Sequence, residues 1–232
     1  MATKIRRLLA GFLLGPTPAK SAFRLAPVAP TPQKDPYVAS ITFDPKTSAL
    51  LVMDFQTAIV EMVGTGKDAL LAETAKLIDA ARKCGMRLIY IVVGFRPGYP
   101  EGSPRNQNFG PIRESGRFAA GSPGTEIHPV VAPRPGEVIV TKHRVSAFAG
   151  TDLDMILRAN GIETLLLAGI ATGGVVLSTL RHAADADYRI VVVEDCCADR
   201  DPEVHRVLME KVFVRQATVI PASQATAALS AP

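Results

Sequence analysis

Apolar runs of strand length that alternate with stretches of helical periodicity constrain this chain more than any other feature. The runs are continuous rather than alternating, as expected for strands that are covered on both faces. They predict six strands at residues 49–54, 87–93, 137–141, 164–168, 189–194 and 217–220. Helices are predicted at residues 69–84, 151–160, 175–186 and 202–214. This order favours an α/β fold, doubly wound, with a six-stranded, mainly parallel sheet and helices on both faces.

The first 36 of the 232 residues differ in composition from the rest. Six of the 18 prolines fall between Pro16 and Pro36, which favours an extended segment. Before them, K-I-R-R-L-L-A-G-F-L-L-G has a basic start and a short apolar run. Residues 1–36 are therefore interpreted as a targeting segment or a flexible extension, and residues 37–232 as one domain. We expect a cytoplasmic protein, or an exported or organellar one if residues 1–36 are a targeting segment.

The charge pattern argues against a nucleic-acid partner. Six basic residues precede the first acidic one, Asp35, and removing them from the net charge of +4 leaves −2 for residues 35–232. A body without excess positive charge lacks the usual footprint for binding phosphate backbones. No apolar run reaches the roughly 18 residues that span a bilayer, so we expect a soluble protein that binds a small molecule.

Cysteine and histidine are too few and too scattered for a metal or disulfide framework. The three cysteines are Cys84, Cys196 and Cys197, an odd number without a C-x-x-C pair. This favours a reducing compartment and argues against a zinc site. We therefore predict no metal and no cofactor.

Residues 94–136 lose all periodicity and form a long connection after a predicted strand. Arginines and aromatic residues alternate in it: Arg96, Arg105, Arg113 and Arg117, with Phe95, Tyr99, Phe109 and Phe118. Loops after parallel strands commonly bind ligands, so the segment is a candidate lid for an anionic or aromatic group. The alternative is a solvated surface loop.

Three chemical features follow the predicted strands at their carboxyl ends. They are Asp54, Lys142 and a glycine-containing turn at residues 169–174. Because parallel strands end at one edge of a sheet, we expect these features to converge. A carboxylate beside a lysine in a dry cleft can act as a general acid or base, and the turn amides can hold an anion. A structural ion pair is the alternative interpretation.

Four motifs resemble those of the isochorismatase-like hydrolases, or cysteine hydrolase superfamily. They are L-L-V-M-D-F-Q, T-K-H-R-V-S-A-F-A-G-T-D-L-D, A-G-I-A-T-G-G-V-V-L-S-T and V-V-V-E-D-C-C-A-D, in family order between residues 41 and 220. The resemblance implies a Rossmann-like three-layer sandwich. In most members it also implies a Cys–Asp–Lys triad that hydrolyses a C–N bond.

Matched residue by residue, Asp54 and Lys142 fall on the aspartate and lysine of the family. The turn of Ile170, Ala171, Thr172, Gly173 and Gly174 falls on the oxyanion turn, with a cis peptide expected at Ile170–Ala171. The departure is Val175, which stands where most members have the nucleophilic cysteine. Valine cannot be a nucleophile, so no thioester can form there.

Cys196 and Cys197 follow the next predicted strand, and we do not expect either of them to replace the missing thiol. The true isochorismatases also lack the cysteine; in them the aspartate protonates carbon and water attacks. They have glycine at the position of Val175, so valine should narrow the pocket. The metal-binding aspartate and histidine pattern of nicotinamidases is absent after Asp54.

Two functions stay open at this point. The first is hydrolysis of a small organic, anionic or aromatic substrate at an amide or vinyl-ether bond, through Asp54 and Lys142 and without a thiol. The second is a catalytically inactive binding or scaffold protein. Gln56, Arg96 and Phe148 are further candidates for substrate binding. We expect a homo-oligomer, either a dimer or a tetramer.

Overall fold

The computed structural model describes residues 41–230 of the chain. The expected N-terminal extension and its boundary at residue 37 lie outside this range. Within it, no helix is both long and apolar enough to cross a membrane.

The six predicted strands form one sheet in the order β3-β2-β1-β4-β5-β6. All five neighbouring pairs are parallel. The strands are β1 (Ser48–Met53), β2 (Arg87–Val93), β3 (Val138–Lys142), β4 (Thr164–Ile170), β5 (Arg189–Ala198) and β6 (Thr218–Ile220). The strand order reverses between β1 and β4, and ligands in such sheets bind beyond the carboxyl ends at this reversal.

Seven α-helices, extended by tighter and wider helical turns, accompany the sheet in residues 41–230. The α-helices are α1 (Thr57–Val60), α2 (Lys67–Lys83), α3 (Gly110–Ser115), α4 (Leu153–Ala159), α5 (Leu177–Asp185), α6 (Pro202–Val207) and α7 (Ala222–Ser230). The 3₁₀ turns are η2 (Glu61–Gly66), η3 (Pro129–Val131) and η6 (Phe213–Arg215), and the π-helical turns are η4 (Thr172–Val176) and η5 (Leu208–Val212).

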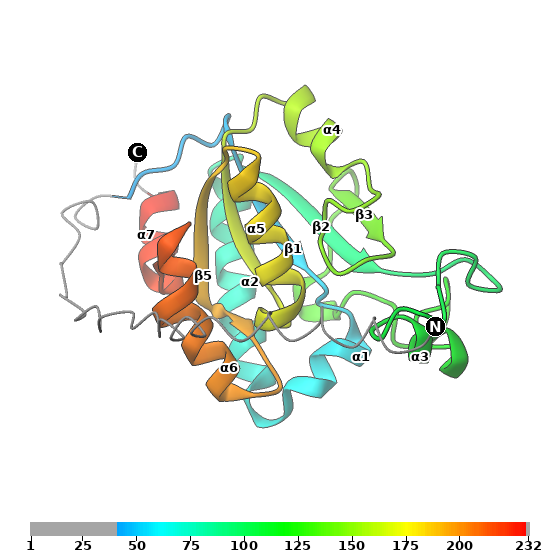
Figure 1. Cartoon of the computed structure of the whole chain (residues 1–232). Helices are drawn as coiled ribbons and strands as arrows, with labels where there is room; N and C mark the ends of the chain where they lie inside the picture. Colours follow the sequence, from blue (N-terminus) through cyan, green and yellow to red (C-terminus); the bar gives the residue numbers. More distant parts are fainter. Residues whose placement is uncertain (1–40, 231–232) are drawn as a thin grey trace, which may run out of the picture. The chain divides into compact units, whose positions relative to one another are not determined.

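The helices cover both faces of the sheet, so the predicted three-layer arrangement is confirmed (Figure 1). Alternate residues of β1 enter opposite cores: Leu50 and Val52 pack on the side of α2 and α7, whereas Leu51 and Met53 pack on the side of α4 and α5. This alternation explains why the strand is apolar throughout, since both of its faces are buried.

Several elements differ from the sequence prediction, and α1, η2, α3 and η3 are helical segments where no helix was predicted. Strand β5 extends to Ala198, four residues beyond the predicted end at residue 194, because Cys197 and Ala198 still pair with β4 after an irregularity in register. Helix α7 was not predicted at all. Its apolar residues Ala222, Ala225 and Leu229 pack in the core beside α2, but alanine is too common outside helices to reveal a short helix by periodicity.

The lid segment, residues 94–136, lies beyond the carboxyl ends of the strands, with α3 outside the sheet layers (Figure 1). A separate apolar cluster holds it together, built on Val93, Phe95, Phe109 and Phe118. The side chain of Gln56 fastens the segment to the sheet: its Nε2 donates to the carbonyl oxygens of Val93 and Thr125, both at 2.9 Å.

Candidate active site

Asp54 and Lys142 form a buried ion pair at the edge where the strands end. Lys142 is the last residue of β3, and Asp54 directly follows β1 in a left-handed backbone conformation, with φ of 58°. The Nζ of Lys142 lies 2.9 Å from Oδ2 of Asp54, and the two side chains are 3% and 7% exposed. The convergence that the sequence predicted for these two residues is therefore present in the fold.

The carboxyl group of Asp54 is only partly satisfied. Its Oδ2 meets Lys142, but Oδ1 is buried without a hydrogen-bond partner among the described residues. Burial raises the pKa of Asp54 above its ordinary value, and the charge and hydrogen bond of Lys142 oppose this rise. Lys142 also donates to the carbonyl oxygen of Arg144 at 3.2 Å, which fixes its ammonium group from a second direction.

The turn after β4 has the backbone form that the resemblance implied. The Ile170–Ala171 peptide bond is cis, and the next five residues form the π-helical turn η4, which leads into α5. Two amides of this turn already have partners: the Gly173 N–H donates to Oδ2 of Asp199 at 2.7 Å, and the Gly174 N–H donates to the carbonyl oxygen of Ala171 at 3.0 Å. These two N–H groups are therefore engaged within the protein rather than free for an anion.

A pocket of about 690 Å³ joins the ion pair to the turn. Asp54, Lys142, Ala171, Gly173 and Val175 all line it. Val175 is 3% exposed, and its side chain also packs in the core with Val176 and Leu180. The residue that the resemblance places at the nucleophile position thus belongs to the wall that contains the ion pair.

The opposite wall comes from the lid segment and the α1–η2 region. Phe109, Ile112 and Phe118 supply apolar surface, and Ile59 and Met62 continue it. The lid segment therefore lines the same pocket as Asp54 and Lys142.

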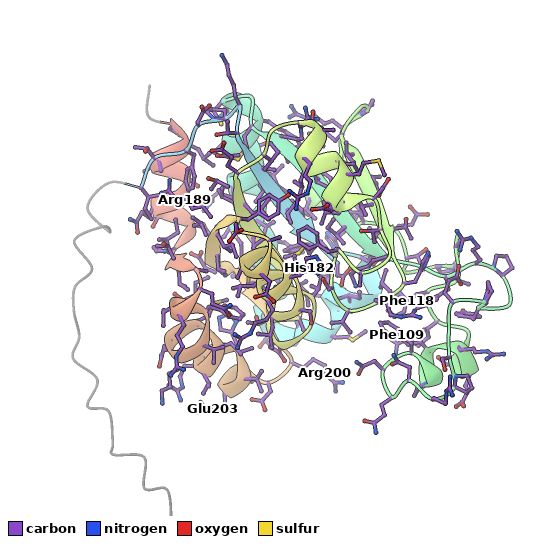
Figure 2. The ribbon with its side chains drawn as sticks, turned by 45° about the horizontal axis from the view of Figure 1, so that its top comes forward. Phe109, Phe118, His182, Arg189, Arg200 and Glu203 are labelled. Carbon is purple, nitrogen blue, oxygen red and sulfur yellow. The ribbon has the colours of Figure 1, made fainter. Side chains whose placement is uncertain are left out.

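Two arginines also line the pocket: Arg117 belongs to the lid segment, and Arg200 is the second residue after β5. In Figure 2, Arg200 comes from the side of β5 and α6, whereas Phe109 and Phe118 come from the lid side. Neither arginine forms an ion pair with a carboxylate of the described residues. Arg117 lies over the ring of Phe118, 5.1 Å from its centroid. The pocket therefore offers two uncompensated positive charges beside apolar surface.

Arg200 was missed by the sequence analysis because β5 was predicted to end at residue 194. With the strand extended to Ala198, the arginine follows the strand end by two residues and reaches the same edge as Asp54. A strand that ends in charged and cysteine residues, E-D-C-C-A, gives no apolar signal for this extension.

Three predicted substrate-binding residues do not line this pocket. The side-chain amide of Gln56 is used by Val93 and Thr125, and its Oε1 accepts from the Val93 N–H at 2.8 Å, so no polar atom remains for a ligand. Arg96 is 70% exposed and pairs with Glu101. Phe148 is buried and stacks on His182, with ring centroids 4.4 Å apart. Their sequence positions near strand ends did not determine the direction of their side chains.

None of the three cysteines lines the pocket, although all of them lie in the described part of the chain. Burial raises the pKa of Cys196 to about 12, and burial also raises the pKa of Cys197. Both thiols therefore stay protonated and unreactive near neutral pH. The prediction that neither replaces a thiol at Val175 agrees with this geometry. Within residues 41–230, no group of three or more His, Cys, Asp or Glu side chains could hold a metal ion.

Comparison with known proteins supports one family. A ureidoacrylate amidohydrolase, RutB of Rhizobium rhizogenes, is 32% identical over 200 residues, covering 77% of this chain and 78% of that protein. The protein of the same name from Agrobacterium fabrum is also 32% identical, covering 77% and 84% of the two chains.

Similar solved structures support the same family of hydrolases. An isochorismatase family protein from Burkholderia thailandensis has 29% identity and a TM-score of 0.68, covering 82% of this chain and 98% of that one. The N-carbamoylsarcosine amidase from Thermoplasma acidophilum has 32% identity and a TM-score of 0.62, covering 76% and 96%. The model of the isochorismatase domain matches residues 48–224. With this match over most of the chain, and with the parallel sheet that these relatives share, the protein belongs to the isochorismatase family of hydrolases.

Proposed function

We propose that this protein hydrolyses a small organic molecule with Asp54 as general acid and a water molecule as nucleophile. The observation that carries the proposal is Oδ1 of Asp54, which is buried at the pocket without a partner in the described residues. A buried polar atom left without a hydrogen bond costs about 1–3 kcal/mol, so such an atom at a ligand cavity is suited to meet substrate or water. Its raised pKa favours the protonated form that an acid requires.

Lys142 and the turn have supporting roles in this proposal. The ammonium group of Lys142 holds one carboxyl oxygen of Asp54 and leaves the other directed to the ligand. The turn from Ile170 to Gly174 forms the adjoining wall, where the remaining backbone groups contact the polar end of the substrate. Two of its amides are already engaged, so the turn contributes fewer donors than its sequence alone suggested.

The walls support a substrate with an anionic group and an apolar body. Arg117 and Arg200 supply positive charge without carboxylate partners, and guanidinium groups bind carboxylates and phosphates well. The rings of Phe109 and Phe118 supply the apolar surface. A small anionic molecule with an unsaturated or aromatic body matches both features.

Val175 determines which reaction is favoured. Without a thiol, a reaction that needs only an acid and water fits best, and hydrolysis of a vinyl ether is such a reaction. Asp54 donates its proton to the substrate carbon, and water adds to the resulting oxocarbenium ion and returns a proton to Asp54. The hemiketal formed in this way then breaks its ether C–O bond, which releases a carbonyl compound and an alcohol. The names of the relatives favour an amide bond instead; there Asp54 would protonate the leaving nitrogen after direct attack by water.

The test is a substrate panel that contains isochorismate, ureidoacrylate, N-carbamoyl amines and simple amides, followed by Asp54→Asn on any active compound. We expect the variant to lose about 10²–10⁴-fold in kcat, the usual contribution of a general acid or base. Asp44→Asn is the matched control, because Asp44 is exposed at the opposite end of β1. Turnover by Asp54→Asn at the wild-type rate contradicts the mechanism.

A non-catalytic binding protein is the second candidate, and the specific observation in its favour is Val175 in the pocket wall. It predicts no turnover across the panel while ligands still bind. Val175→Cys separates the two cases. If this variant alone gains amidase activity, the remaining pocket is competent and only the nucleophile has been lost.

A further inference from the structure

Two side chains that do not line the pocket form hydrogen bonds with the turn after β4. Oδ2 of Asp199 accepts the N–H of Gly173 at 2.7 Å, and Nδ1 of His205 lies 2.8 Å from Oγ1 of Thr172. Gly173 lines the pocket, whereas neither Asp199 nor His205 does. Thr172 itself is completely buried. Both bonds therefore act on the pocket wall without direct access to a ligand.

The bond from Asp199 fixes the peptide plane between Thr172 and Gly173. In a trans peptide the N–H and C=O groups point in opposite directions. Here the N–H is bound by Asp199, and the carbonyl oxygen of Thr172 accepts from the N–H of Leu177 at the start of α5. Because both ends of the plane are tied, Asp199 decides which way this part of the wall faces. A bond to a carboxylate is also stronger than one to a neutral acceptor.

Packing between the turn and α6 leaves little room for movement. A Cβ on Gly173 would lie 3.1 Å from Cγ1 of Val204 and 3.2 Å from Oδ2 of Asp199, so a larger residue would fit only if these two side chains shifted. Helix α6 itself is capped by Asp201, whose Oδ1 accepts the N–H of Glu203 at 2.9 Å. The segment from Asp199 to α6, which contacts the turn, is therefore stabilised by the N-terminal cap of α6.

We propose that Asp199 and His205 are positioning residues of the hydrolase site. Asp199 acts through Gly173, and His205 acts through Thr172, so that the wall beside Asp54 keeps the spacing that the reacting substrate needs. Arg200, which follows Asp199 directly in the chain, lines the same pocket. This inference rests on the proposed function, since it assigns the turn to the wall that the substrate meets.

The kinetic test uses Asp199→Ala, His205→Ala and the conservative Asp199→Asn with a compound hydrolysed by the wild type. Loss of one hydrogen bond to the turn should lower kcat about tenfold for each alanine variant, while KM stays within about threefold. Asp199→Asn keeps an oxygen that can accept the Gly173 N–H, so it should recover most of the rate. If the alanine variants keep the wild-type kcat, the positioning role of Asp199 and His205 is overturned. The role of Asp54 as general acid is tested separately by Asp54→Asn.

Asp195→Ala is the matched control. Asp195 lies on β5, four residues before Asp199, and its Oδ1 accepts the backbone N–H of Ala222 at 2.6 Å, on the side of α7 and outside the pocket. Like Asp199→Ala, the Asp195→Ala substitution removes a hydrogen bond between a carboxylate and a backbone N–H. A similar fall in melting temperature is therefore expected, but kcat should not change. If Asp195→Ala and Asp199→Ala lower kcat equally, the role of Asp199 is only structural and the proposal fails.

A measurement without turnover keeps the two proposals distinct. Amide hydrogen exchange of Gly173 in the ¹⁵N-labelled full chain should be about tenfold faster in Asp199→Ala than in the wild type or Asp195→Ala. If no compound in the panel is hydrolysed, the proposed function fails. The positioning role fails separately if amide exchange and the chemical shifts of residues 172–175 are unchanged in the Asp199 and His205 variants.

Discussion

The two walls of the pocket differ in how the chain builds them. The sheet wall consists of strand ends and the turn after β4, and its charged pair, Asp54 and Lys142, is almost completely buried. The lid wall is an irregular segment in which Arg117 is exposed and its guanidinium group lies over the ring of Phe118 without a carboxylate partner among the described residues. The comparison teaches that the reactive groups are placed by sheet register, whereas the groups suited to select a substrate belong to a segment with little regular structure.

The sheet wall should show the largest effect on rate. Lys142→Met removes the group that orients Asp54, and kcat should fall about 100-fold, as expected for a misplaced catalytic group. Activity requires protonated Asp54, so it is present below the pKa of this group and lost as pH rises through it. Because Lys142 lowers that pKa, its removal should move the loss of activity to higher pH. A pH–rate profile checks this, and an unchanged profile contradicts the assignment.

The hydrogen bonds of Gln56 that join the lid segment to the sheet should affect stability more than reaction rate. Gln56→Ala breaks three hydrogen bonds that join Val93 to Thr125, and the free energy of unfolding should fall by about 2–4 kcal/mol. Urea denaturation measures this change. Gln216→Ala is the control, because Gln216 accepts a hydrogen bond from the exposed Arg181 and should lose at most about 1 kcal/mol. Equal losses in the two variants would show that the lid is not fastened through Gln56.

The lid wall should affect binding rather than rate. For an anionic substrate, Arg117→Gln should raise KM about tenfold and leave kcat within about threefold, since the charge interacts equally with the ground state and the transition state. Arg105→Gln is the control in the same segment, because Arg105 is exposed and does not line the pocket. A fall in kcat without a change in KM would remove the distinction between the walls.

Thiol reagents should have the smallest effect. Iodoacetamide can reach the half-buried Cys84, whereas the raised pKa values of Cys196 and Cys197 keep these two thiols unreactive. Activity should therefore survive treatment that modifies Cys84, as mass spectrometry can verify. Val175→Cys should make the sheet wall sensitive to the same reagent. Inactivation of the wild-type protein would point to a catalytic thiol that the pocket does not contain.

The sequence predicted the charged pair at the sheet edge, but it did not predict the directions of the side chains of Gln56 and Phe148. Asp54 and Lys142 follow apolar runs, and parallel strands must end at one edge, so their convergence required no knowledge of the packing. Gln56 and Phe148 also lie near strand ends, but they turn to backbone carbonyl groups and to His182. The direction of a side chain beyond a strand end depends on its neighbours in space, which the local pattern does not contain.

By itself, the sequence determined the layered parallel fold, the family and the charged pair of the candidate site, with valine where a thiol is expected. Hydrophobic periodicity and residue identity are local properties, and they are sufficient for these conclusions. Only the tertiary structure decided that β5 extends far enough to bring Arg200 to the pocket and that Asp199 and His205 hold the turn from behind. Those contacts join residues about 30 positions apart, so they exist only after the sheet and α6 have packed together.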